Sequence, residues 1–176
     1  MRLKHRSNRT LFLSLLLLFV ILSAACGGAA TAELTPPTIH YGEDICEFCG
    51  MIMSDERYAA GYLTEAGEER IFDDVGGMFQ AHLQMQEEVA AFFVHDYEDV
   101  VWLRAEEAHY VLSEDLATPM LFGLAACATE QRAERLAGEV GGTVLTFDEV
   151  MNHYREHSAM TGEAGLDQHD HDHHNH

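Results

Sequence analysis

The sequence predicts an α+β domain made of two β-β-α-β-like halves. Short apolar stretches that alternate every second residue are followed by stretches with a helical period. Acidic residues or glycines stand where the predicted helices begin or end. The order of strands and helices found in the first part of the chain appears again in the second part. The length of 176 residues suits one domain with extensions at both ends.

The first predicted half has a hairpin, a helix and a third strand. Its elements are a strand at 58–64, a turn at 65–68, a strand at 69–72, a helix running through Met85 and a strand at 91–95. Asp73 or Asp74 can cap the helix. The helix carries Met78, His82 and Met85 at spacings of three and four, which places them near one face and predicts that they pack in the core.

The second predicted half repeats this pattern. Its elements are strands at 100–103 and 108–112, an apolar run with strand character at 121–127, a helix at 130–138, a strand at 143–147 and a last helix reaching about Glu156. A glycine at the end of 130–138 is expected to terminate that helix. Asp148 is expected to cap the last helix.

Residues 1–25 are predicted to be a signal peptide of the lipoprotein type. Four basic residues precede an apolar run over 11–25, which is shorter than the usual membrane-spanning helix. The run ends in small residues before Cys26 and resembles a lipobox, in which Cys26 becomes the lipidated N-terminus. Ser23 stands where a large aliphatic residue is usual, so ordinary cleavage and an uncleaved anchor remain alternatives. Lipidation predicts a protein anchored outside the cytoplasmic membrane.

The rest of the chain divides into three parts. Residues 26–39 read as a flexible tether, residues 40–157 as the folded domain, and residues 158–176 as a disordered tail with few large apolar residues. The tail ends in five imidazoles interleaved with carboxylates, at His169, His171, His173, His174 and His176. Such tracts bind divalent metals loosely and suit Cu(II), Ni(II) or Zn(II) better than Cu(I). The alternative is a solvated tail without a function.

Charge excludes one class of partner. Without residues 1–25 the chain carries six arginines against 30 acidic residues, a net charge of −24. Nucleic-acid binding depends on cationic contacts to phosphate, so a nucleic-acid-binding function is excluded. Adhesion to anionic lipid is also disfavoured, and membrane attachment has to come from the N-terminus.

The segment Cys46-Glu47-Phe48-Cys49-Gly50-Met51, followed by Met53, is the most informative motif. Thiolates and thioethers are the softest side-chain ligands and together select Cu(I) over harder ions. The C-x-x-C spacing lets both sulfurs turn toward one point, and the glycine lets the backbone bend so that Met51 approaches the same point. Met53 is either a further soft ligand or a core residue. The motif therefore predicts a copper(I) site.

Three other interpretations of the cysteines stay open. A structural zinc ribbon requires a second cysteine or histidine pair, whereas the remaining Cys127 lies alone in an apolar run. A thioredoxin-like redox motif requires a helix start after a strand, whereas the residues before Cys46 read as loop. A structural disulfide between Cys46 and Cys49 is the third interpretation. Cys127 itself is expected to be a buried small apolar residue.

The chain resembles the NosL family of nitrous oxide reductase accessory lipoproteins. The resemblance lies in Asp44-Ile45-Cys46-Glu47-Phe48-Cys49-Gly50-Met51, Ile71-Phe72-Asp73-Asp74 with Met78, Val94-His95-Asp96-Tyr97, Trp102, Ala108-His109-Tyr110-Val111, Thr118-Pro119-Met120, Gly141-Gly142-Thr143-Val144 and Phe147. It covers roughly residues 40–150, which is nearly all of the predicted domain.

The resemblance implies a copper chaperone, not an enzyme, outside the cytoplasmic membrane. Such a protein delivers Cu(I) toward the copper–sulfide centre of nitrous oxide reductase, and its partner is the maturation machinery of that reductase. The resemblance also implies that Met120 is a second thioether beside Cys46, Cys49 and Met51. The alternatives are a general copper-binding lipoprotein and a thiol–disulfide oxidoreductase that uses Cys46 and Cys49. The sequence assigns no oligomeric state.

Overall fold

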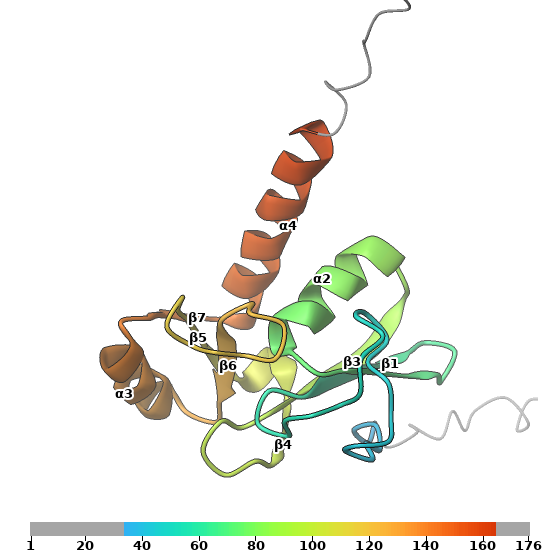
Figure 1. Cartoon of the computed structure of the whole chain (residues 1–176), viewed down its shortest axis with the longest axis horizontal. Helices are drawn as coiled ribbons and strands as arrows, with labels where there is room; N and C mark the ends of the chain where they lie inside the picture. Colours follow the sequence, from blue (N-terminus) through green and yellow to red (C-terminus); the bar gives the residue numbers. More distant parts are fainter. Residues whose placement is uncertain (1–33, 165–176) are drawn as a thin grey trace, which may run out of the picture. The chain divides into compact units, whose positions relative to one another are not determined.

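The computed structural model describes residues 34–164, with side chains through Ser158, and forms two antiparallel sheets (Figure 1). One sheet has four strands in the order β2-β1-β3-β4, and the other has three in the order β6-β5-β7. The elements are β1 (Ala60–Thr64), β2 (Glu69–Phe72), α2 (Val75–Met85), β3 (Val89–His95), β4 (Trp102–Arg104), the 3-10 turn η1 (Ala105–Glu107), β5 (His109–Leu112), β6 (Leu124–Cys127), α3 (Glu130–Val140), β7 (Thr143–Leu145) and α4 (Phe147–Ala164).

In the first sheet, β1 is flanked by the two strands that follow it. Ala60 of β1 lies opposite Phe72 of β2 and opposite Val94 of β3. The chain leaves β2 and enters α2 through Asp74, whose carboxylate accepts a hydrogen bond from the amide of Gly76 at 2.9 Å. An acceptor at this position satisfies one of the amides that a helix start leaves unpaired. Asp74, rather than Asp73, is therefore the cap.

In the second sheet, β5 is flanked by β6 and β7 in the same way. Val111 of β5 lies opposite Ala125 of β6 and Val144 of β7. Thr129 caps α3 by accepting from the amide of Arg132, and α3 packs against all three strands. The helix ends at Gly141 in the left-handed conformation that glycine tolerates, three residues beyond the expected glycine.

The two halves share one topology, which confirms the predicted α+β class with two β-β-α-β-like halves. In each, the first strand is central, and the helix connects its two neighbours. The prediction of a strand at 100–103 in the second half is wrong. The strand lies at Trp102–Arg104 instead, and it extends the first sheet beside β3. Val100 has a φ of +53°, which is incompatible with a strand, so the strand begins later. Leu121 and Gly123 have positive φ values and shorten the strand expected at 121–127 in the same way.

The last helix begins with a cap other than the predicted Asp148. The hydroxyl of Thr146 accepts from the amide of Glu149, and the Glu149 carboxylate accepts from the amide of Thr146 at 2.8 Å. This reciprocal pair is a capping box, so the helix starts one residue before Asp148. It continues to Ala164, past the expected end near Glu156 and into the segment expected to be tail.

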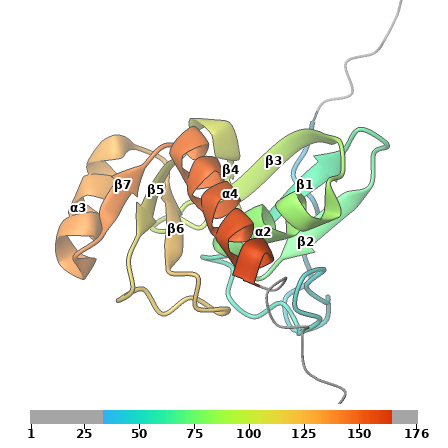
Figure 2. The same cartoon turned by 90° about the horizontal axis from the view of Figure 1, so that it is seen from above.

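Two hydrophobic clusters hold the fold together, and both lie in the segment that starts at Leu34. The larger joins both sheets, α2 and α4 around Tyr62, Phe79 and Tyr110, and the smaller lies between α3 and the second sheet. Figure 2 shows α4 passing beside α2, which it contacts. The segment from Leu34 on therefore carries its own core. Among the described residues, none of the helices combines the length and apolar character needed to span a membrane.

Candidate metal centre

The segment Cys46–Met51 forms a closed turn ahead of the first sheet. The amide of Gly50 donates to the carbonyl of Cys46 at 2.9 Å, and the amide of Cys46 donates to the carbonyl of Met51 at 2.8 Å. Gly50 has a φ of +71°, a conformation that residues with a Cβ rarely adopt. Ile45 and Ile52 pair as an antiparallel bridge at the base of the turn. The glycine of the motif therefore serves the function predicted for it, which is to bend the backbone.

The two thiols of this turn lie near one another. Both Cys46 and Cys49 are free, and Cys46 is close enough to influence the pKa of the Cys49 thiol. Cys46 is only 1% exposed, whereas Cys49 is partly accessible. Burial raises the pKa of the Cys49 thiol; a hydrogen bond from the amide of Met51 opposes this rise, and the neighbouring Cys46 adds to it. Both sulfurs are thus close enough to reach a single ion.

The cysteine turn is attached to both halves of the molecule. The amide of Glu47 donates to the carbonyl of Ile71 in β2 at 3.0 Å. The ring of Phe48, between the two cysteines, lies 6.3 Å from the ring of Phe122, measured between centroids. Phe122 follows Met120 by two residues, so this contact brings the loop of Met120 to the cysteine turn.

A buried carboxylate holds the loop of Met120 in place. Asp74 is fully buried and accepts from the hydroxyl of Thr118 at 2.5 Å and from the amide of Met120 at 3.0 Å, in addition to its bond to Gly76. Burial raises the pKa of Asp74, and these hydrogen bonds act against the rise. Asp74 therefore connects the start of α2 to a loop more than forty residues away.

Two glycines let this loop pack closely on α2. A Cβ at Gly77 would lie 3.0 Å from the sulfur of Met120. A Cβ at Gly76 would overlap the Phe122 side chain and the Tyr154 hydroxyl. The first turn of α2 therefore has to be free of side chains where the sulfur of Met120 approaches it.

The structure brings most of the predicted ligands to one region. Cys46 belongs to the larger hydrophobic cluster, and Cys49 and Met120 pack against it. Met51 is 54% exposed at the edge of the cysteine turn. Met53 is fully buried in the same cluster, so it is a core residue and not an accessible ligand. Two thiols, a half-buried thioether and an exposed thioether thus remain the candidate ligands, and their joint binding of one ion stays a prediction.

Other sulfur and imidazole side chains have structural partners. Met78 and Cys127 are fully buried, as expected, and burial raises the pKa of the Cys127 thiol to about 12. His95 is buried, pairs through Nδ1 with the carbonyl of Ala59, and stacks on Trp102 with ring centroids 3.8 Å apart. These side chains take no part in the cysteine site.

Two groups of predicted residues lie outside the described part of the chain, namely Cys26 and the five tail histidines from His169 to His176. Within residues 34–164, the side chains of His, Cys, Asp and Glu form no group of three or more that could hold a metal ion. At the cysteine turn the protein thus offers two ionisable sulfurs, with thioethers as the additional donors. A soft, low-coordinate ion suits such a set.

Sequence reasoning missed the part played by Asp74 and Thr118. The pair Asp73-Asp74 before an apolar stretch predicts a helix cap, and that prediction is confirmed. Nothing in the sequence links Asp74 to Thr118, because the two lie 44 residues apart and meet only through packing of the two halves.

Comparison with known proteins identifies a family, a related sequence and a related structure. A family model described as NosL matches residues 37–155. A protein of Stutzerimonas stutzeri named "Copper-binding lipoprotein NosL" is 30% identical over 178 residues, which cover 95% of this chain and 92% of that protein. The crystal structure of the copper chaperone NosL from Shewanella denitrificans has a TM-score of 0.57 and 19% identity, with 65% of this chain and 94% of that chain covered. At this identity the last match bears on the fold alone.

Proposed function

The chain belongs to the NosL family, and from this premise we propose that it is an exported copper(I) chaperone. Its cargo is bound by the thiolates of Cys46 and Cys49 with the thioethers of Met51 and Met120. It delivers copper toward assembly of the copper–sulfide centre of nitrous oxide reductase. In this role the protein carries an ion from one partner to another and catalyses no covalent reaction.

One observation carries the proposal: two free thiols lie near each other in a turn whose Phe48 packs against Phe122, in the loop that carries Met120. A zinc site would need further charged or imidazole ligands. A redox motif would need a cysteine whose pKa is lowered, typically at a helix start. Here burial raises the pKa of Cys49, and the cysteine turn precedes a strand hairpin. These features favour soft-metal binding over disulfide exchange.

The difference in exposure suggests the order in which the ligands act. Cys49 is the more accessible thiol, so we place it as the ligand that first meets the ion. Cys46 then binds from the buried side, and Met120, whose backbone is held by Asp74, supplies a thioether. Met51 is exposed and can leave or join without disturbing the core. A partner's sulfur can therefore enter as Met51 departs, and the ion is transferred through a shared intermediate.

The N-terminus supplies the location in this proposal. A lipid on Cys26 would hold the protein outside the cytoplasmic membrane, and the relative from Stutzerimonas stutzeri is named a lipoprotein. The large negative charge of the remaining chain disfavours direct contact with anionic lipid. Pro37 is buried against β1 and the Thr38 amide donates to Glu69, so the end of the predicted tether belongs to the folded domain. The part of the chain between Cys26 and this point would keep the copper site away from the surface and available to the maturation machinery.

The test is a Cu(I) titration of reduced residues 34–176 against a competing chelator. Cys46→Ser and Cys49→Ser are each expected to lower the affinity by at least about tenfold, since a hydroxyl is a hard and protonated replacement for a thiolate. Met51→Ala and Met120→Ala are expected to weaken binding less, because a thioether is neutral. Cys127→Ala is the matched control, since it removes a thiol that is buried away from the site. X-ray absorption of the loaded protein should show Cu(I) with mainly sulfur ligands.

The outcomes separate the candidate functions. If one cysteine alone matters, the ligand set is wrong but copper binding stands. If neither substitution changes Cu(I) affinity, or the protein prefers Zn(II) in competition, the copper assignment is wrong. Reduction of insulin disulfides by the reduced protein, without tight Cu(I) binding, would favour the thiol–disulfide oxidoreductase. A general copper-binding lipoprotein would be favoured by two results together. The protein would bind Cu(I) tightly, and nitrous oxide reductase would keep its normal copper content in cells that lack the protein.

A further inference from the structure

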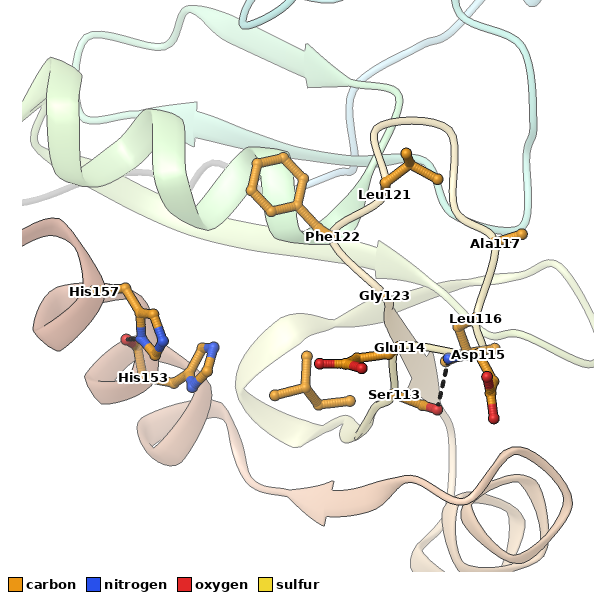
Figure 3. Close-up of a pocket in the computed structure, with 11 residues that line it drawn as sticks. Ser113, Glu114, Asp115, Leu116, Ala117, Leu121, Phe122, Gly123, His153 and His157 are labelled. Atoms are coloured by element: carbon orange, nitrogen blue, oxygen red, sulfur yellow. Dashed lines mark hydrogen bonds between the residues drawn. The ribbon is translucent and has the colours of Figure 1, made fainter. Parts of the chain in front are cut away.

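Helix α4 carries two histidines one turn apart that face a cavity. His153 and His157 line this cavity of about 400 Å³ together with residues of the 112–123 segment. Figure 3 shows both imidazoles on the same side of the helix, with the carboxylate of Glu114 extending towards them from the opposite wall. The spacing of four residues places the two side chains on one helix face.

The ring geometry suits joint coordination of one ion. The centroids of the two imidazoles lie 4.1 Å apart, with the ring planes inclined by 39°. Two imidazoles bound at right angles to one ion, with metal–nitrogen distances of about 2.0–2.1 Å, have centroids about 4.5 Å apart. The two rings are therefore close enough for one ion to reach both.

A hydrogen bond also sets the protonation of one ring. Nδ1 of His157 lies 2.8 Å from the carbonyl oxygen of His153. A carbonyl can only accept, so Nδ1 carries the proton and Nε2 of the neutral ring is the acceptor nitrogen. Histidines that bind metals commonly donate their other ring N–H to a backbone carbonyl, which fixes the tautomer and the orientation of the ring. The same bond in the metal-free protein thus prepares Nε2 of His157 as a ligand.

The surroundings favour a cation. Glu114 and Asp115 lie on the opposite wall of the cavity, and the chain as a whole is strongly acidic. Among the side chains that the structure describes, which end at Ser158, no group of three histidine, cysteine or carboxylate ligands includes this pair.

We propose that His153 and His157 form a second metal site, separate from the cysteine turn, that binds a divalent transition metal through two imidazoles. Imidazole nitrogen suits Zn(II), Ni(II) and Cu(II), whereas the cysteine turn suits Cu(I). The residues His153 to His157 read H-x-x-E-H, a spacing that also places two histidine ligands on one helix face in a class of zinc peptidases. Two protein ligands and open positions make this site one for reversible binding.

The experiment uses Ni(II) as the probe and NMR spectra of residues 34–164. This segment contains both hydrophobic clusters and lacks the tail histidines, so it isolates the pair on α4. Ni(II) is expected to broaden the backbone signals of 150–158 at the first equivalent. Because the signals are assigned to residues, binding at the thiols is told apart from binding at α4. His153→Ala and His157→Ala are each expected to weaken this binding at least about tenfold.

A spacing control keeps the number of histidines constant. The variant with both His157→Ala and Arg155→His moves one imidazole to the second position after His153, on a different face of the helix. It is expected to bind as weakly as His157→Ala, with unchanged helix content by circular dichroism. If Ni(II) affects α4 only when the tail is present, or if the spacing control retains full affinity, then the pair on α4 is not a site and the proposal is overturned.

Discussion

Replacing Asp74 tests whether the fold positions the second half of the copper site. The side chain is fully buried and accepts three hydrogen bonds, from Gly76, Thr118 and Met120. Asp74→Asn keeps the shape but offers a single acceptor oxygen. If that oxygen faces Thr118 and Met120, the amide group faces the Gly76 N–H, and the helix cap is lost. The opposite orientation leaves the Met120 N–H without an acceptor.

The size of the effect follows from these bonds. Loss of the cap costs about 1 kcal/mol, and each bond from Thr118 or Met120 to a charged acceptor is worth about 1.5–3 kcal/mol. Removing a charge that is costly to bury offsets part of the loss, as the raised pKa of Asp74 indicates. We therefore expect the free energy of unfolding to fall by about 1–3 kcal/mol in Asp74→Asn and by about 2–5 kcal/mol in Asp74→Ala.

The pH dependence of this effect has a definite sign. Burial raises the pKa of Asp74 in the folded state, so the folded protein retains the proton to a higher pH than the unfolded chain. The stability that this group contributes is present below its unfolded pKa of about 3.9 and is lost as the pH rises through the folded pKa. The free energy of unfolding that Asp74→Asn loses relative to the unchanged protein should thus be larger at about pH 5 than at pH 7.

The same substitution should also weaken copper binding if Met120 is a ligand. Asp74→Asn frees the backbone of Met120, and we expect a loss of Cu(I) affinity close to that of Met120→Ala. The double variant Asp74→Asn/Met120→Ala should lose little more than Met120→Ala alone, because both changes remove one interaction. Such non-additivity separates a positioning effect on Met120 from general destabilisation.

Urea denaturation followed by circular dichroism, and Cu(I) competition on the same samples, measure both effects. Asp148→Asn is the matched control, because Asp148 is exposed at the start of α4. An unchanged urea midpoint in Asp74→Ala would refute the stability argument. A normal Cu(I) affinity in Asp74→Asn, with reduced stability, would show that the loop of Met120 does not hold a ligand. Fully additive losses in the double variant would lead to the same conclusion.

Three further predictions concern the thiol, the anchor and the tail. Cu(I) affinity should rise about tenfold per pH unit for each proton displaced, and the rise should continue to the raised pKa of Cys49; a flat profile in competition assays would mean that this thiol does not bind. Cys26→Ala should release the protein from the membrane fraction or leave the signal uncleaved, and unchanged fractionation and processing would contradict lipidation. Deletion of 168–176 should leave Cu(I) affinity within about threefold while weakening Ni(II) or Zn(II) binding, and a large loss of Cu(I) affinity in the chelator assay would identify ligands in the tail.

Local patterns in the sequence predicted the class of the fold and the type of chemistry. Strand and helix periods depend on neighbouring residues, so the first hairpin, α2 and the order of both halves were predictable. The proximity of Cys46 and Cys49 was also predictable, because only two residues separate them in the chain. Caps were less certain where two candidates stood near each other: Thr146 caps α4 through a reciprocal bond with Glu149, whereas Asp148 lies inside the helix.

Contacts between distant segments were decided only by the tertiary structure. The strand Trp102–Arg104 joins the first sheet because the backbone at Val100 turns it towards β3. The periodicity of its residues does not by itself predict which strand it pairs with. Met53 and Met51 are both thioethers close to the cysteines, yet packing buries the first completely and leaves the second 54% exposed. Asp74 meets Thr118 and Met120 only because the two halves pack together. The sequence by itself determined which soft ligands are available, and the packing of the halves decided which of them lie together and what holds them there.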